Sequence, residues 1–138
     1  MKKIILIAAA ALIFFFVIWQ SFIRGALLIP SADRFVTSFY EQYNKGDFWY
    51  LYNVLSDQKV RNRMSPPQFQ AMMRDSYQQL GPVQSRKKIK ATGKYGKNGP
   101  YAELEYKVKR AKVESLEKFV LIRKKKDWFV FDYYIRAV

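Results

Sequence analysis

The sequence contains no cysteine and no histidine among its 138 residues. Without cysteine the chain has no disulfide, no thiolate metal site and no cysteine nucleophile. The absence of histidine removes the commonest general base and the commonest zinc ligand. The sequence also has no Walker phosphate loop, no glycine-rich dinucleotide turn and no carboxylate metal cluster. We therefore expect a protein that is not an enzyme and that needs neither a metal nor a cofactor.

Acidic residues are scarce, because 11 Asp and Glu stand against 25 Lys and Arg, a formal net charge of +14. This excess favours anionic partners, which include phospholipid head groups, nucleic acid and acidic protein surfaces. Aromatic residues, in contrast, make up 17% of the chain. That share predicts an aromatic core together with an aromatic contact surface.

One long hydrophobic run, IILIAAAALIFFFVIWQSFI, extends from Ile4 to Ile23. Twenty helical residues rise about 30 Å, the thickness of the hydrocarbon core of a bilayer. Lys2 and Lys3 precede the run, and Arg24 follows it. The pattern predicts a single-pass transmembrane helix in a bacterial inner (cytoplasmic) membrane, with the anchor residues Ile4, Phe14, Phe15, Phe16, Trp19 and Phe22.

Two other interpretations of this run stay open, a cleaved signal peptide and a buried core helix. The stretch that follows the apolar residues reads WQSFIRGA and has no good small-x-small cleavage site, which favours the uncleaved anchor. The two lysines before the helix favour a cytoplasmic N-terminus, and a long exported domain largely escapes the charge rule. We therefore expect the domain on the periplasmic side.

The chain divides into an anchor and connector at residues 1–30 and a basic domain at residues 31–138. Ser31 is expected to cap a first helix after the connector GALLIP, and Ser65 with Pro66 to begin a later one. Apolar spacing predicts three helices, at 32–43, 48–55 and 66–80, with a further turn through residues 60–64. Alternation predicts strands at 83–95, 102–109, 114–124 and 128–135, the last nearly apolar and hence central in the sheet.

Three short motifs stand out: Gly46-Asp47 after a helix, Leu80-Gly81 with Ser85-Arg86, and the closing segment DWFVFDYYIR that ends at Arg136. They resemble the motifs of one small bacterial family of unknown function in the cone-shaped superfamily named for nuclear transport factor two. The resemblance covers about residues 32–138. It implies an α+β fold: after the transmembrane helix, a three-helix plus four-stranded antiparallel curved-sheet cone. The sequence departs from the family in Phe131-Asp132, where small residues are usual, and in its strong basic character.

Enzymes of that superfamily work in the mouth of the cone, and the best acid for such a role here is Asp132. A carboxyl group buried in an aromatic pocket has a raised pKa and can act as a base. The pocket would be formed by Tyr106, Asp132 and Tyr134, and Tyr133 is a further possible partner of the Asp132 carboxyl group. The alternative is that Asp132 faces outward and pairs with a lysine.

Basic residues gather in runs on the predicted strands. On adjacent strands these runs would merge into one positive face for an anionic partner. Anionic lipid head groups, an acidic partner subunit and a merely solvated face all fit, whereas the few nearby aromatic residues argue against nucleic acid. The residues of this face are Arg86, Lys87, Lys88, Lys90, Lys94, Lys97, Lys107, Lys109, Arg123 and Lys125.

The sequence thus favours a non-catalytic, membrane-anchored accessory or assembly subunit. Its domain would dock on a larger membrane complex or on a second copy of itself. Trp49 and Tyr50 are candidates for an exposed contact patch or for a place on the membrane interface close to the anchor, although partial burial also fits them. The alternatives are a small-molecule-binding or enzymatic pocket around Asp132, and electrostatic binding to anionic lipid or nucleic acid.

Overall fold

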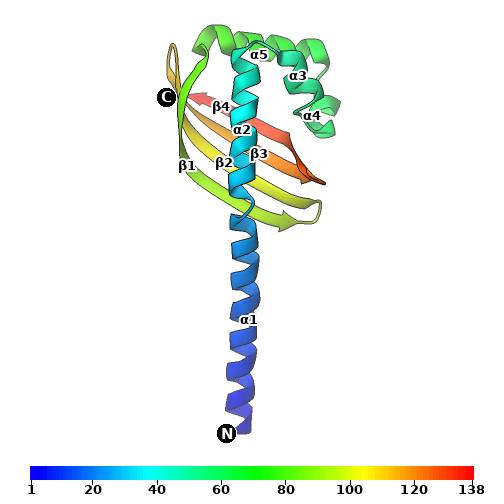
Figure 1. The fold of residues 1–138 in the computed structure, drawn as a ribbon, viewed down its shortest axis with the longest axis vertical. Coiled ribbons are helices and arrows are strands. Elements are labelled where there is room, and N and C mark those ends of the chain that lie inside the picture. Colours follow the sequence, from blue (N-terminus) through cyan, green and yellow to red (C-terminus); the bar gives the residue numbers. More distant parts are fainter.

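The computed structural model describes residues 1–138 as an α+β protein (Figure 1). Five helices precede four strands: α1 (Lys2–Ala26), α2 (Ile29–Asn44), α3 (Phe48–Asn53), α4 (Gln58–Arg63), α5 (Pro66–Leu80), β1 (Val83–Gly96), β2 (Gly99–Arg110), β3 (Glu114–Lys124) and β4 (Asp127–Ala137). The strands form one antiparallel sheet in the order β1-β2-β3-β4. The predicted α+β class and the four antiparallel strands are confirmed. The domain has one helix more than expected, because the turn after Asp57 continues into the short helix α4.

The predicted transmembrane run forms a single helix that projects away from the domain (Figure 1). It is long and apolar enough to cross a membrane, and none of its apolar window is buried inside the protein. The six predicted anchor residues are all exposed, and the rings of Phe15 and Trp19 stack along the helix. The alternative of a buried core helix is therefore wrong.

The expected connector between anchor and domain is not a loop. Leu27 and Leu28 keep helical backbone angles, so α1 passes into α2 with only a turn between them. Ser31 is not the N-cap, because α2 already begins at Ile29 with Pro30 in its first turn, where a missing N–H costs nothing. The Ser31 hydroxyl instead donates to the Leu28 carbonyl and accepts a bond from the indole of Trp128.

Helix α2 packs against the inner face of the sheet and forms the centre of the core with it (Figure 1). Alternate strand residues point inward, as the sequence pattern of β2 predicts, and those of β2 and β3 are almost fully buried. The aromatic core is confirmed: the ring of Phe119 lies edge-on to those of Phe39, Tyr40 and Tyr106.

Strand β4 lies at the end of the sheet, so the prediction of a central strand is wrong. Its apolar character has another cause, since the chain between α3 and α4 covers part of its free edge. The amide of Asp57 donates to the carbonyl of Val130, and the amide of Val130 donates to that of Leu55. The other free edge of the sheet, on the polar strand β1, has no such bridge.

Candidate functional site

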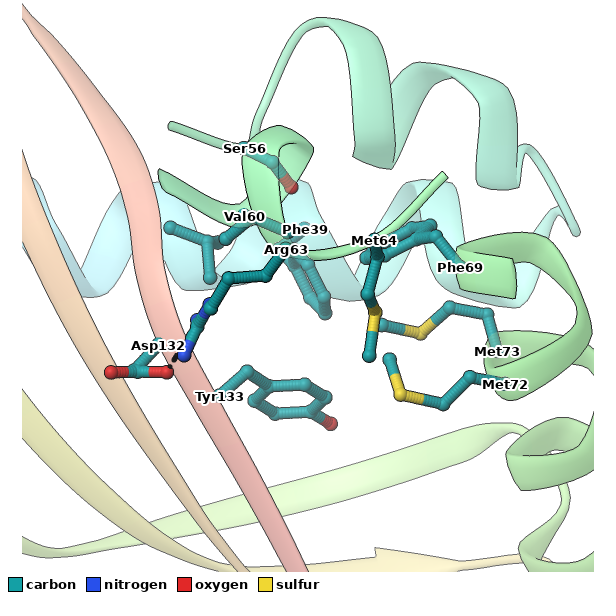
Figure 2. Close-up of a pocket in the computed structure, with 11 residues that line it drawn as sticks. Phe39, Ser56, Val60, Arg63, Met64, Phe69, Met72, Met73, Asp132 and Tyr133 are labelled. Carbon is teal, nitrogen blue, oxygen red and sulfur yellow. Dashed lines mark hydrogen bonds and ion pairs between the residues drawn. The ribbon is translucent and has the colours of Figure 1, made fainter. Parts of the chain in front are cut away.

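A pocket of the domain lies between β4 and the helices α4 and α5 (Figure 2). Its volume is about 280 Å³, and most of the residues that line it are apolar. Three methionines, Met64, Met72 and Met73, gather on one side, while Arg63 and Asp132 meet on the other. Methionine side chains adapt their shape readily, so this cavity suits an apolar group of variable outline.

Helix α5 supplies Phe69, Met72 and Met73 to this pocket, on one face as their spacing predicts. Its start is fixed by a complete capping box, in which Ser65 accepts from the amide of Gln68 and the Gln68 side chain accepts from that of Ser65. The sequence predicted this helix start correctly. It did not predict that the helix lines a cavity.

Asp132 does not have the environment of a general base. Its carboxylate accepts a bond from Arg63 at 2.8 Å (Figure 2) and another from Lys59 at 3.2 Å, and both residues belong to α4. Burial raises the pKa of Asp132, but the bonds and charges of Arg63 and Lys59 outweigh it and leave that pKa below its usual value. The expected raised pKa is wrong. Of the alternative, the pairing with a lysine is confirmed, but the outward orientation is not, because the Asp132 side chain is 17% exposed and lines the pocket.

The structure does not bring the three predicted pocket residues together. Tyr106 is buried on the inner face and donates to Asp33 on α2 at 2.5 Å. Tyr134 is 55% exposed and points to the outer face, since its partner Lys118 and its inward neighbour Tyr133 fix the alternation of β4. The tyrosine that lines the pocket with Asp132 is Tyr133, which the sequence also offered as a partner of that carboxyl group.

A buried ion pair, which the sequence did not reveal, lies beside the pocket. Arg110 binds Glu117 with two parallel bonds, Nη2 to Oε1 at 2.7 Å and Nε to Oε2 at 2.9 Å. Both side chains are 0% exposed. The Glu117 carboxylate also accepts from Ser115, Tyr40 and Tyr133, so its oxygens are fully used.

These contacts set the protonation of the whole cluster. Burial raises the pKa of Glu117, but the bonds from Arg110, Ser115 and Tyr133 overcome it and hold that pKa below its usual value. Burial and the neighbouring carboxylate raise the pKa of Tyr40 and Tyr133. Glu117 is therefore charged and both tyrosines are neutral at neutral pH. The only sequence signal was an acid at an inward position of a half-buried strand.

The ten residues of the predicted basic face do not form one surface. Arg86 and Lys88 point inward and contact Asp33, and Arg86 also donates to Thr37 at 2.6 Å. Lys107 faces outward and pairs with Glu114. Four residues lie on the outer face, and the four others lie near strand ends or turns. Those on the outer face are Lys87, Lys90, Lys107 and Lys109.

The remaining members lie at the ends of the hairpins. Lys94 and Lys97 are exposed at the β1–β2 hairpin, and Lys125 is exposed in the β3–β4 turn with a left-handed backbone. Arg123 is half-buried with its guanidinium over the ring of Trp128. Arg86 was the clearest misassignment, because an inward arginine on a polar edge strand gives the same sequence pattern as an exposed one.

No known protein family matches the chain, and no curated protein is similar enough to count as a relative. No group of three acidic side chains lies close enough together to hold a metal ion. The structure defines an α+β protein with one long apolar N-terminal helix.

Proposed function

We propose that the chain is a non-catalytic accessory subunit, held in a membrane by α1, whose domain makes protein–protein contacts within a larger membrane complex. The observation that carries this proposal is the state of the ionisable groups. Every carboxyl group whose pKa is clearly shifted has a lowered pKa, because cations and hydrogen-bond donors outweigh the effect of its burial. Every tyrosine whose pKa is clearly shifted has a raised pKa. No group is moved towards neutrality, where an acid or base catalyst works. The groups are Asp33, Asp57, Glu117, Asp132, Tyr40, Tyr106 and Tyr133.

The contact surface that we favour lies on the helices at the end of the domain farthest from α1 (Figure 1). Trp49 on α3 is 60% exposed, although a tryptophan side chain is strongly favoured inside. Val54 and Met72 in the same helical layer are also exposed. Tryptophan is the residue type most enriched at the energetic centres of protein interfaces. Tyr50 is only half-buried but packs on the core, so it is not part of this surface.

Native gel separation of membranes solubilised in mild detergent tests this assignment. The wild-type chain should migrate in an assembly larger than the monomer, and Trp49→Ser should release it. Tyr134→Ser is the matched control, because Tyr134 is a similarly exposed aromatic residue on the outer face of the sheet. A wild-type chain that migrates as a monomer, or a control that releases it equally, contradicts the proposal.

We also propose that α1 crosses a bacterial cytoplasmic membrane with the domain in the periplasm. The two lysines before α1 support this orientation. Because the chain has no cysteine, the single variant Gln79→Cys places one thiol at an exposed position of α5. A membrane-impermeant maleimide added to intact spheroplasts should label it. Labelling only after lysis would place the domain in the cytoplasm.

For the domain itself we propose membership of the cone-shaped superfamily named for nuclear transport factor two. The support is the antiparallel sheet packed on α2, with short helices at one end and a pocket between them (Figure 1). The motif Gly46-Asp47 has a structural role that agrees with this, since Gly46 has a positive φ and Asp47 caps α3. An experimental structure whose sheet does not enclose α2 would contradict it.

The pocket supports a second candidate function, the binding of a small apolar ligand. Its volume of about 280 Å³ is near the lower limit of small-molecule sites. Met72→Trp places a larger side chain at its half-open wall, where Met72 is partly exposed. If small hydrophobic compounds raise the Tm of the wild-type chain in detergent, this variant should abolish the increase. The absence of any compound that raises the wild-type Tm counts against a ligand site.

A further inference from the structure

The end of α1 is attached to the edge strand β1 by direct contact between two backbones. A Cβ atom on Gly25 would lie 2.0 Å from the carbonyl oxygen of Gly93, and one on Gly93 would lie 2.0 Å from that of Gly25. No side chain fits between them. Gly25 is the one buried residue of α1. The helix therefore cannot pivot freely, and its position fixes the position of β1.

This contact places the second half of β1 at the depth of the lipid head groups. Gly25 lies two residues beyond Ile23, the end of the hydrophobic run, which is about 3 Å along a helix. A groove of about 600 Å³ separates the last turns of α1 from β1. Residues on both of its walls include Ser21, Phe22, Arg24, Gly93, Lys94 and Tyr95. Trp19, one turn below Ile23, is a residue type enriched at membrane interfaces.

The chain presents free positive charge at this level. We call Arg24, Lys90, Lys94, Tyr95 and Lys97 the juxtamembrane edge. All five are exposed, and none of the four cations has a carboxylate within ion-pair distance. No acid occurs between residues 76 and 102. The adjacent carboxylate Glu103 already pairs with Lys118, and only Glu105, opposite Lys90, opposes this charge.

Lysines on an unpaired sheet edge also prevent edge-to-edge aggregation, which is a simpler reason for their presence. Two features favour a lipid partner over that reason. The edge lies beside the membrane helix rather than at a distance from it (Figure 1). Tyr95 is 58% exposed at the same place, and tyrosine is a typical residue of the membrane interface. Protection from aggregation requires neither feature.

We propose that the juxtamembrane edge binds the anionic phospholipid head groups of the membrane that α1 crosses, and that this contact holds the domain with β1 against the bilayer. The inference rests on the membrane anchoring in the proposed function, but not on the partner complex. Lys94 and Lys97 neutralise phosphates, and Tyr95 enters the interface between them. Each basic residue near an anionic surface increases binding about fivefold, so three lysines together give roughly a hundredfold.

The test uses the full chain in lipid vesicles, with one fluorophore on Asn98→Cys in the β1–β2 turn, where Asn98 is exposed. Quenching by head-group nitroxide lipids reports how closely this turn approaches the bilayer. It is measured in phosphatidylcholine alone and with about one third phosphatidylglycerol, the lipid that supplies the anionic charge. The proposal expects stronger quenching with phosphatidylglycerol, and expects high salt to reverse the increase.

The combined variant Lys90→Gln, Lys94→Gln and Lys97→Gln should lose this increase. The control variant Lys45→Gln, Arg74→Gln and Lys109→Gln removes the same charge from exposed residues remote from the β1–β2 hairpin, and should keep it. The proposal is overturned if quenching is equal in both lipids or if the control variant loses the increase equally. It is also overturned if a DNA duplex changes the fluorescence of the probe as much as the anionic vesicles do. Flotation with the vesicles reports anchoring separately, so a failure of α1 to insert is distinguished from a failure of the edge to bind.

Discussion

Replacing Glu117 by glutamine should strongly destabilise the domain, because it leaves a buried arginine without a counter-charge. The amide keeps the size of the side chain and one acceptor oxygen for Tyr40, Tyr133 and Ser115. It cannot neutralise Arg110, which is 0% exposed and has Glu117 as its only ion-pair partner. Breaking a buried pair in this way costs about 3–5 kcal/mol. The free energy of unfolding of a domain of this size is about 5–15 kcal/mol in total, so the Tm should fall by more than about 10 °C.

The measurement is thermal unfolding of the full chain in detergent, followed by the near-ultraviolet circular dichroism of the buried tyrosines. Glu114→Gln is the control, since Glu114 lies on the same strand but pairs with Lys107 at 3.4 Å where both side chains are about half exposed. The free energy of unfolding of that variant should fall by less than about 1 kcal/mol.

A double-mutant cycle with Arg110→Met then separates the pair from its surroundings. The variant that carries both changes removes both charges, so it should be less destabilised than the sum of the two single variants by about 2 kcal/mol or more. The Arg110–Glu117 pair does not have the role that we assign to it if Glu117→Gln lowers the free energy of unfolding no more than Glu114→Gln does. The same holds if the losses of the two single variants simply add in the double variant.

Three further predictions follow from other contacts. Stability should be flat near neutral pH, because the chain has no histidine. It should fall in acid as the carboxyl groups of depressed pKa become protonated, and in alkali as the buried tyrosines of raised pKa ionise, in a circular-dichroism titration. If Glu117→Gln loses as much stability in acid as the wild-type chain does, the prediction for acid is contradicted. Gly93→Ala should separate α1 from β1, so that cross-linking between Ser21→Cys and Lys94→Cys falls; unchanged cross-linking would show that the two backbones do not touch. Ser65→Ala should cost about 1 kcal/mol by removing the cap of α5, and no change in Tm would show that the capping box is not stabilising.

Features that depend on neighbours in the chain could be predicted from the sequence. The hydrophobic run, the Ser65 cap and the alternation of β2 each depend on residues a few positions apart. The start of α2 was predicted three residues late, at Ala32 and not at Ile29, because Leu27 and Leu28 continue the helix where the sequence resembles a linker. Backbone angles at such a junction depend on packing, and Leu28 is buried in the core.

The pocket could not be predicted in the same way. The outcome for Asp132 depended on whether α4, more than sixty residues earlier in the chain, would lie beside β4, and it does. The sequence pattern indicated the correct strand but did not decide between Tyr133 and Tyr134, since the β-bulge opposite Val120 and Leu121 changes the register between β3 and β4.

The sequence by itself determined that the chain has an apolar N-terminal helix and an α+β domain, because hydrophobic periodicity and capping are local properties. Only the tertiary structure decided which charges are neutralised. Arg110 and Asp132 occupy similar places in the sequence, each on a strand among alternating residues, yet one is buried with Glu117 and the other pairs with α4 at a pocket. The close approach of Gly25 to Gly93 was also decided there, because two glycines sixty-eight positions apart carry no signal until the fold brings their backbones together.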